Sequence, residues 1–333
     1  MNKKLTILIL IKPFDQTFPK HKPKMEMIRE IENFAEVYYW YQDGDIRDIL
    51  SKLNITPDFI FHYDIAWDRY ALAPKITGLD QVNIPKGCFV IDLHWNNPKR
   101  EAYIYKNKID LIFSVSKHPF LTVFPKFENK LCWLPWSINP KLFKDWNQEK
   151  TIDFLLMGLV YSDDPNLNLK VQAPKGRYAF RDQVLERMKD EPGFVFHPHP
   201  GHFAKGSALF MNEKYAKELN RSKIFFTCGS TNKTGSFAVL KYFEALGCKT
   251  LLLAEPNKDV KDLGFIDGVN YVACNTENFY EKAHYYLKNE GEREKIVAAG
   301  YQFIHQNHTN QVRAKQFVNY VQEFISRTDT KHI

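Results

Sequence analysis

One segment of the sequence places a lysine and a glutamate in a helix that is otherwise apolar. The segment GSTNKTGSFAVLKYFEALGCKTLLLAE runs from Gly229 to Glu255 and begins as a loop of small polar residues. Lys241 and Glu244 are three residues apart, so a helix brings them to one face. There the ammonium group can bind a phosphate, and the carboxylate can accept hydrogen bonds from a ribose diol. From spacing alone, the alternative is an exposed ion pair, which contributes only a few tenths of a kcal/mol.

The loop before this helix has the composition of an anion-binding turn. Gly229, Gly235 and several hydroxyl side chains precede the helix, and we expect Thr234 or Ser236 to cap its first turn. A helix start presents unpaired N–H groups and a partial positive charge, so it favours a phosphate. Together with Lys241, the loop therefore predicts a phosphate site at the start of the helix.

Two other patterns resemble metal sites, and both have a simpler explanation. The segment FHPHPGH holds His197, His199 and His202, but its prolines force an extended loop and no cysteine or acidic residue is nearby. We expect a structural loop, or one that contacts a phosphate or a sugar. The segment QDGDI resembles a D-x-D metal motif, but Asp45 stands where it would cap the next helix. We therefore expect no metal site.

Short apolar runs alternate with helical patterns along the chain and must position these residues. Near-continuous apolar strands separated by helices predict a parallel sheet covered on both faces. The first run, Leu5–Ile11, resembles a signal peptide, but it is short and lacks a small-residue cleavage site, so we expect a buried strand. A segment rich in Pro, Trp and Asn at 133–151 interrupts the alternation, which restarts with a strand at 152–158.

The interruption predicts an α/β fold of two parallel-sheet domains in tandem. We place the first domain at 1–140, the second at 151–310 and a final amphipathic helix within 311–333. In open α/β sheets, ligands bind outside the carboxyl ends of the strands. We therefore expect two Rossmann-like domains that face each other across a ligand-binding cleft.

Composition limits the class of protein. The chain has 333 residues with 15% aromatic residues and a net charge of +7, which fits a mildly basic globular protein without a basic block. The five cysteines form no C-x-x-C pair, so a reducing cytoplasm is expected and a disulfide framework or zinc site is not. No apolar stretch reaches the roughly 20 residues that a membrane-spanning helix needs.

The sequence that follows Lys241 resembles the C-terminal half of GT-B fold glycosyltransferases, and is most similar to the CgeB-type (spore-maturation-like) family. The shared pattern is a basic residue, Phe-Glu-Ala, a small/Cys/Gly turn, an apolar strand at 251–253, Tyr-Tyr-Leu, Glu-Arg-Glu, Ala-Gly and a terminal His-Thr…Arg. The segment 109–143 is similar, more loosely, to the approach to the interdomain linker in that family.

The resemblance implies a nucleotide-sugar donor, which we expect to be a UDP-sugar, held by the second domain. Glu244 matches the glutamate that binds the donor ribose, and Lys241 replaces an arginine that is usual in the family. Ser236 stands where many relatives have a second glutamate, which leaves the donor sugar open. Gly158 matches the turn beneath the diphosphate, and Arg181 matches a phosphate-binding arginine; a plain turn glycine and a helix-surface arginine are the alternatives.

The same resemblance implies that the first domain binds an acceptor with a hydroxyl group and that the last helix crosses back to that domain. Glycosyl transfer needs a group that accepts the proton of the attacking hydroxyl, or an equivalent retaining path. Asp92 and His94, at the end of a predicted strand in VIDLHWNN, are the first candidates, and His62 and Asp64 are weaker ones. Trp95 follows and could stack on a sugar, although turn and core roles are the alternatives for each.

The sequence thus predicts a metal-independent glycosyltransferase without a cofactor. Lys241, Arg181 and the helix start would stabilise the leaving diphosphate. One alternative is a nucleic-acid-associated protein, such as a sugar transferase that acts on a modified DNA base. The other is a catalytically silent GT-B protein that binds a nucleotide or glycan. The expected donor contacts are Gly158, Arg181, His199, Gly235, Ser236, Lys241 and Glu244.

Overall fold

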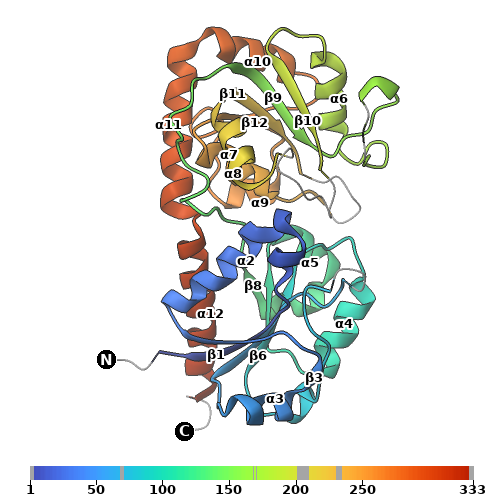
Figure 1. Cartoon of the computed structure of the whole chain (residues 1–333), viewed down its shortest axis with the longest axis vertical. Coiled ribbons are helices and arrows are strands. Elements are labelled where there is room, and N and C mark those ends of the chain that lie inside the picture. Colours follow the sequence, from blue (N-terminus) through green and yellow to red (C-terminus); the bar gives the residue numbers. More distant parts are fainter. Residues whose placement is uncertain are drawn as a thin grey trace. The chain divides into compact units, whose positions relative to one another are not determined.

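The structure of the chain, a computed structural model, describes residues 4–67, 71–167, 169, 171–200, 210–229 and 235–329. The chain divides into two compact units, each with its own parallel β-sheet and covering helices (Figure 1). Unit 1 comprises Met1–Thr17, Lys24–Pro135 and Gln311–Ile333. Unit 2 comprises Phe18–Pro23 and Trp136–Asn310.

Unit 1 contains eight of the strands that the structure describes. Its strands are β1 (Thr6–Leu10), β2 (Glu36–Trp40), β3 (Gly44–Asp45), β4 (Phe59–His62), β5 (Ile76–Thr77), β6 (Lys86–Val90), β7 (Leu111–Ser114) and β8 (Leu131–Trp133). Its helices are α1 (Phe14–Thr17), α2 (Lys22–Arg29, whose first two residues belong to unit 2), α3 (Ile46–Leu53), α4 (Asn97–Lys106), α5 (His118–Val123) and α12 (Asn310–Asp329), with 3-10 turns at Glu30–Asn33, Leu79–Gln81 and Pro125–Lys130.

The main sheet of unit 1 is parallel throughout, with the strand order β2-β1-β4-β6-β7-β8. Strand β1 is buried along its whole length, which confirms that the apolar start of the chain is a core strand. The strand order reverses between β1 and β4, and a ligand crevice in a doubly wound sheet lies at such a point. Asp45 accepts a hydrogen bond of 3.0 Å from the Arg47 N–H and caps α3, as predicted.

Helix α12 packs on the sheet of unit 1. The ring of Phe317 lies 6.3 Å from Phe59 and 4.6 Å from Phe113, measured between centroids. At the sheet edge, Arg313 Nε donates to the carbonyl of Pro135 (3.1 Å), and Gln316 Nε2 donates to the carbonyl of Trp133 (3.0 Å). These contacts attach the last helix to the sheet of unit 1 through a shared hydrophobic core.

Unit 2 alternates strands and helices regularly. Its strands are β9 (Ile152–Gly158), β10 (Phe194–Pro198), β11 (Ser222–Thr227), β12 (Leu251–Ala254) and β13 (Val272–Ala273). Its helices are α6 (Ala179–Met188), α7 (Asn212–Asn220), α8 (Leu240–Gly247), α9 (Lys258–Asp262), α10 (Phe279–Lys288) and α11 (Glu290–Asn307), with 3-10 turns at Pro19–His21 and Pro165–Leu167.

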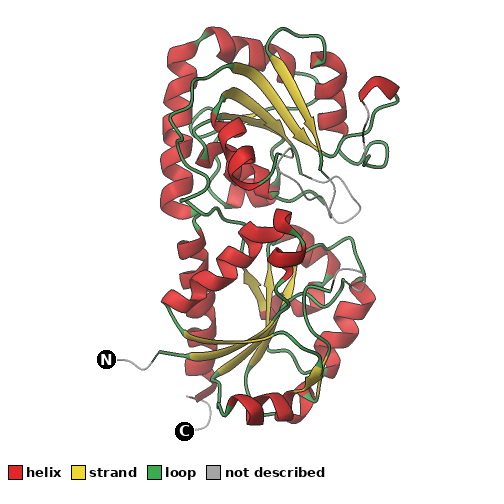
Figure 2. Cartoon of the chain, viewed as in Figure 1, coloured by secondary structure: helices red, strands yellow, loops and turns green. Residues whose placement is uncertain are grey.

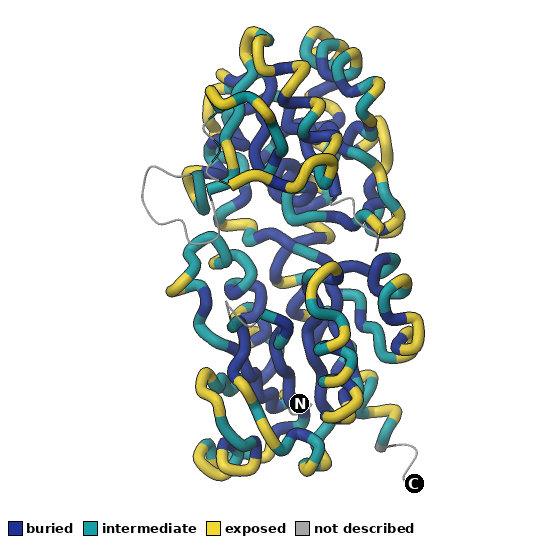
Figure 3. Tube along the Cα trace, turned by 90° about the vertical axis from the view of Figure 1, so that its right-hand side faces the viewer, coloured by how far each residue is buried: buried dark blue, intermediate teal, exposed yellow. Residues whose placement is uncertain are grey.

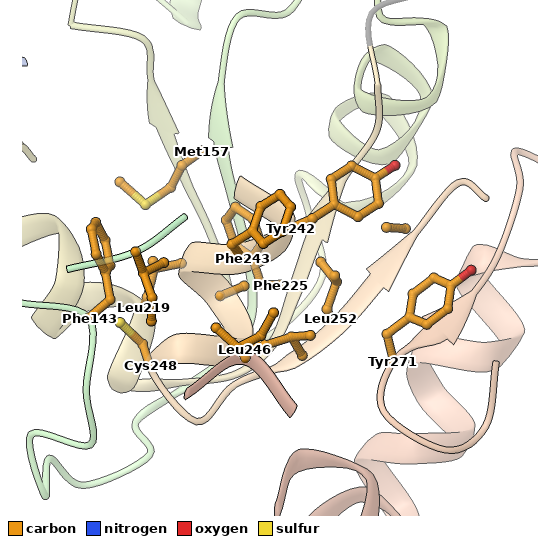
Figure 4. Close-up of a cluster of buried hydrophobic side chains, with 14 of the residues drawn as sticks. Phe143, Met157, Leu219, Phe225, Tyr242, Phe243, Leu246, Cys248, Leu252 and Tyr271 are labelled. Atoms are coloured by element: carbon orange, nitrogen blue, oxygen red, sulfur yellow. The ribbon is translucent and has the colours of Figure 1, made fainter. Parts of the chain in front are cut away.

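The sheet of unit 2 is also parallel, with the order β10-β9-β11-β12-β13, and the order reverses between β9 and β11. Helices α7 and α8 cover one face, whereas α6 and α10 cover the other (Figure 2). On the first face, Phe243 and Leu246 of α8 pack over Phe225 and Leu252 of two adjacent strands (Figure 4). The inner strands of both sheets are buried, whereas the edge strands β2 and β10 are only partly buried (Figure 3).

The structure corrects the sequence interpretation at several elements. Strand β8 and the short helices α4, α5 and α9 were not predicted, and only the last residue of β8, Trp133, falls in the segment 133–151 that interrupts the alternation. These elements have three to ten residues, too few for a clear hydrophobic period. No helix in the described part of the chain is long and apolar enough to cross a membrane.

Candidate functional site

Gly158 ends β9 at the point where the strand order of unit 2 reverses. Its φ of +145° is a backbone conformation that favours glycine. A Cβ atom at this position would lie 3.2 Å from Nη1 of Arg181 and 3.4 Å from Cε of Lys241. The Gly158 carbonyl accepts a hydrogen bond of 3.1 Å from the His199 N–H. The strand end therefore brings two basic side chains against a glycine where no larger residue fits without a shift.

Arg181 extends from α6 to the carboxyl ends of β9 and β11, and its side chain is only 4% exposed. Its Nη2 donates to the Cys228 carbonyl (2.9 Å) and to Thr227 Oγ1 (3.3 Å), and its guanidinium stacks on Tyr178 at 4.4 Å. Its Nε is buried and has no hydrogen-bond partner among the residues that the structure describes. A buried guanidinium with unused donors is poised to bind an anion.

Lys241 and Glu244 are joined through a third side chain, Tyr215 of α7. Lys241 Nζ donates to the Tyr215 hydroxyl (3.3 Å), which donates in turn to Glu244 Oε2 (2.8 Å). Glu244 is 5% exposed, and Lys241 is half-buried. The exposed ion pair that spacing alone favoured is therefore wrong, because the two charges are bridged by a buried phenol.

The electrostatic state of Lys241 is unusual for a lysine. The pKa of its ammonium group is lowered to about 8, chiefly by burial; Glu244 raises the pKa and the nearby Arg181 lowers it. Two cations thus lie beside the same glycine, and Glu244 is the acidic group that acts on Lys241. An anion bound between the two cations would relieve their repulsion and raise the pKa of the lysine.

The structure changes the interpretation of the loop before α8. The helix begins at Leu240, and its N-cap is Val239 without a side-chain hydrogen bond, so the prediction that Ser236 caps it is wrong. Ser236 lies instead against Gly229, where a Cβ atom would meet its Oγ. Gly235 adopts a φ of +96° and is exposed. Thr234 lies outside the described residues.

His197 lies in β10 and His199 directly follows that strand, and the two histidines have separate surroundings. His197 Nε2 pairs with Glu218 (2.7 Å) and its ring stacks on Phe210 at 3.7 Å. The His199 ring contacts the Lys20 ammonium, which belongs to the same unit. His202 lies outside the described residues. Within those residues, no three His, Cys, Asp or Glu side chains are grouped closely enough to hold a metal ion.

In unit 1, Asp92 and His94 follow β6, with Asp92 half-buried and His94 exposed. Arg100 of α4 fixes their loop, because its Nη1 donates to the Asp92 carbonyl (2.7 Å). Nη2 of the same guanidinium forms a buried ion pair of 2.6 Å with Oδ2 of Asp64. Asp64 therefore positions the loop, and it is not available as the base that the sequence suggested. Arg100 itself carried no sequence signal.

His62 is also excluded as a proton acceptor for a substrate. Its Nδ1 lies 2.6 Å from the Tyr103 hydroxyl and its Nε2 lies 2.9 Å from the Pro74 carbonyl. Burial lowers its pKa to about 4. Beside the Asp92 loop, however, Trp67 and Trp95 stack with their ring centroids 6.0 Å apart, and Trp95 is 50% exposed. This aromatic pair presents a flat surface next to Asp92 and His94.

The chain belongs to the family described as glycosyl transferase-like, which its sequence matches over residues 141–319, more than half of its length. It is therefore a glycosyltransferase, and its two units have the Rossmann-like α/β organisation of the GT-B fold. No curated protein matches the sequence significantly.

Solved glycosyltransferases share the fold over almost the whole chain. A glycosyltransferase from Rickettsia africae ESF-5 is 12% identical with a TM-score of 0.59, and the match covers 97% of this chain and 99% of that one. Sucrose-phosphate synthase from Thermosynechococcus elongatus is 10% identical, with a TM-score of 0.61 and coverages of 97% and 100%. Anabaena Alr3699/HepE, solved with UDP and glucose, is 11% identical, with a TM-score of 0.55 and coverages of 96% and 100%.

Replacing Gly158 with alanine is expected to lower the free energy of unfolding by about 1–3 kcal/mol, because the new Cβ combines an unfavourable φ with a close contact. Gly176→Ala is the matched control, since Gly176 also has a positive φ (+76°) but nothing within 4 Å of the added atom. Chemical denaturation should show the larger loss for Gly158→Ala. Equal losses would mean that the contact with Arg181 and Lys241 is unimportant.

Proposed function

We propose that this glycosyltransferase transfers a sugar from a UDP-sugar to a hydroxyl acceptor, and that unit 2 holds the donor. One observation carries the proposal: Arg181 and Lys241 converge on Gly158 where the strand order of the sheet reverses. Parallel α/β sheets bind ligands at such points, and two cations beside a glycine suit a diphosphate. The complex of Alr3699/HepE with UDP and glucose supports a uridine diphosphate donor.

Within this site we assign the ribose to Glu244. Its carboxylate is buried and held by Tyr215, so its position is fixed before the donor arrives. A preorganised carboxylate can accept hydrogen bonds from both hydroxyls of a ribose. Gly235, Ser236 and His199 lie on loops at the same edge of the sheet and complete the proposed donor contacts.

The leaving diphosphate would be stabilised by this chain's own cations. Negative charge develops on the leaving oxygen as the glycosidic bond breaks, and fixed donors in a site shielded from water stabilise it strongly. Arg181 and Lys241 supply that stabilisation in the proposed reaction, which therefore needs no metal ion.

For the acceptor we propose unit 1, with Asp92 or His94 accepting the proton of the attacking hydroxyl. Both residues follow β6 in a loop that Arg100 holds in place. The stacked pair Trp67 and Trp95 lies beside that loop and offers an apolar face to a sugar ring. A polar acceptor of this kind, rather than a nucleic acid, agrees with the absence of a basic block in the sequence.

Two finer assignments belong to the same proposal. The similarity of the region around Glu244 to CgeB-type proteins supports that subfamily within the broader family. The five cysteines are all free and buried, which supports a reducing cytoplasm as the site of action.

Replacing Glu244 with alanine is expected to weaken UDP binding by about 10-fold or more, because a charged hydrogen bond to the ribose is lost. Titration calorimetry on the intact chain measures the affinity. Glu213→Ala is a suitable control, since Glu213 is an exposed residue of α7 that pairs with Lys217. An affinity for UDP unchanged from wild type in Glu244→Ala would remove Glu244 from the donor site.

The reaction itself is tested by release of UDP. The wild-type chain is incubated with UDP-glucose, UDP-galactose or UDP-N-acetylglucosamine, with and without a panel of sugar and alcohol acceptors. We expect UDP release from at least one donor, accelerated by an acceptor and independent of added divalent cations. Release that requires a divalent cation would contradict the metal-free role of Arg181 and Lys241.

A further inference from the structure

Glu255 is an acidic residue of unit 2 that neither the fold nor the proposed donor contacts explain. It directly follows β12 at the carboxyl edge of the sheet and is half-buried. Its carbonyl accepts a hydrogen bond of 2.6 Å from the Tyr242 hydroxyl, which fixes the backbone at this position. Its carboxylate, in contrast, has no hydrogen bond or ion pair to any residue that the structure describes.

The neighbours of this carboxylate follow from the strand register. Thr227 pairs with Ala254 and Ala254 pairs with Ala273, so the next residues of the three strands, Cys228, Glu255 and Cys274, are neighbours. Both cysteines are buried, and burial raises the pKa of Glu255 while the Arg181 guanidinium lowers it. A partly desolvated carboxylate between two thiols costs stability unless a partner satisfies it.

Other acidic side chains of unit 2 do have such partners. Glu218 pairs with His197 at 2.7 Å and with Arg221 at 3.1 Å, and Glu244 accepts from Tyr215 at 2.8 Å. Glu255 differs because no side chain in the described part of unit 2 uses the hydrogen-bonding capacity of its carboxylate. A perturbed carboxylate without a structural partner at the ligand-binding edge of a parallel sheet indicates a binding role.

The charged side chains at this edge lie in a definite order. Tyr215 joins Glu244 to Lys241 through hydrogen bonds. Lys241 and Arg181 meet at Gly158, and Arg181 Nη2 donates to the carbonyl of Cys228, which neighbours Glu255. The order is therefore carboxylate, ammonium, guanidinium, carboxylate. A nucleoside diphosphate sugar has a matching order of groups: a ribose diol, two phosphates and a ring of sugar hydroxyls.

We propose that Glu255 binds the hydroxyl groups of the donor sugar, on the far side of the diphosphate from the ribose. The proposal rests on the proposed function, because it takes Glu244 as the ribose ligand and Arg181 with Lys241 as the diphosphate ligands. A carboxylate repels phosphate but accepts strong hydrogen bonds from hydroxyls, so it suits the sugar and not the diphosphate.

The test compares donors with and without the sugar. Calorimetry measures the affinities of UDP, UDP-glucose, UDP-galactose and UDP-N-acetylglucosamine for the wild-type chain and for Glu255→Gln. We expect Glu255→Gln to weaken binding of at least one UDP-sugar by about 10- to 100-fold while UDP binds as tightly as before or more tightly. Glu186→Gln is the matched control, because Glu186 is an exposed glutamate of α6. Thermal melting checks that each variant is folded.

Two results would overturn the inference while the proposed function stands. An equal loss for UDP and all three UDP-sugars would show that Glu255 acts only through Arg181 on the diphosphate. Unchanged affinities for all four ligands would show that Glu255 does not touch the donor. A wild-type chain that binds none of the four ligands would instead contradict the proposed function itself. Glu255→Asp should recover part of the lost sugar affinity, which a purely structural role would not produce.

Discussion

Replacing Lys241 with methionine is expected to lower the affinity for UDP by about 10- to 100-fold and kcat by about 100- to 1000-fold. The variant loses one of the two cations beside Gly158 and keeps the volume of the side chain. The larger effect on kcat follows because charge on the leaving diphosphate increases in the transition state. Calorimetry with UDP and the release of UDP from a UDP-sugar measure the two quantities.

The same variant should be more stable than wild type in the absence of ligand. Because the pKa of Lys241 in the folded chain, about 8, is below the ordinary value of 10.5, the unfolded chain binds more protons between these values. The charged lysine thus costs stability below pH 8, and the cost declines as pH rises toward 10.5. Lys241→Met should therefore melt at a higher temperature at pH 7, with a smaller difference at higher pH.

The pH dependence of binding has the same origin. UDP affinity of the wild type should fall as pH rises through about 8, since the Lys241 ammonium loses its proton there. Lys241→Met should lack this fall. Lys261→Met, at an exposed lysine of α9, is the control and should resemble wild type in every measurement. A UDP affinity of Lys241→Met equal to that of wild type at pH 7 would contradict the role of this lysine.

Replacing Asp92 with asparagine is expected to reduce kcat by about 100-fold or more without changing UDP affinity. The expected loss of kcat corresponds to the removal of a general base, which typically accelerates a reaction by about 10²–10⁴-fold. UDP affinity is preserved because Asp92 belongs to unit 1, whereas the proposed donor ligands belong to unit 2. Rates of UDP release in the presence of an acceptor give kcat, and calorimetry gives the affinity.

His94→Gln separates the two candidate bases. If Asp92 is the base, His94→Gln keeps most of its activity, and the acid limb of the pH–rate profile is lost only in Asp92→Asn. Asp48→Asn, at an exposed aspartate of α3 in the same unit, is the matched control. Full activity in both Asp92→Asn and His94→Gln would place the base on another residue.

Much of the fold was predictable because its strands are short, apolar and bounded by turns. The apolar start of the chain and the run ending at Gly158 are buried strands, as predicted. The start of α8 was placed too early, since the small residues before Leu240 suit a cap but the helix begins after Val239 without a side-chain cap. Local composition could not show that Ser236 packs against Gly229.

Of the site, only the arrangement of residues within one helix could be predicted from the sequence. The sequence indicated that Lys241 and Glu244 share a helix face, and the structure shows both charges there. Tyr215 could not be found from the sequence. It lies in α7, and strand β11 separates α7 from the helix that carries the two charges. Arg100 was missed for the same reason, since its contact with Asp64 spans 36 positions and depends on the fold of unit 1.

Hydrogen exchange on the intact chain, with and without saturating UDP, tests the central claim that unit 2 binds the donor at the carboxyl edge of its sheet. Ligand binding slows exchange where it suppresses local opening. We predict that UDP protects the segments around Gly158, Arg181, Cys228 and Lys241, and that the sheet of unit 1 is protected much less. Protection confined to unit 1, or none at a UDP concentration that saturates binding, would contradict the account.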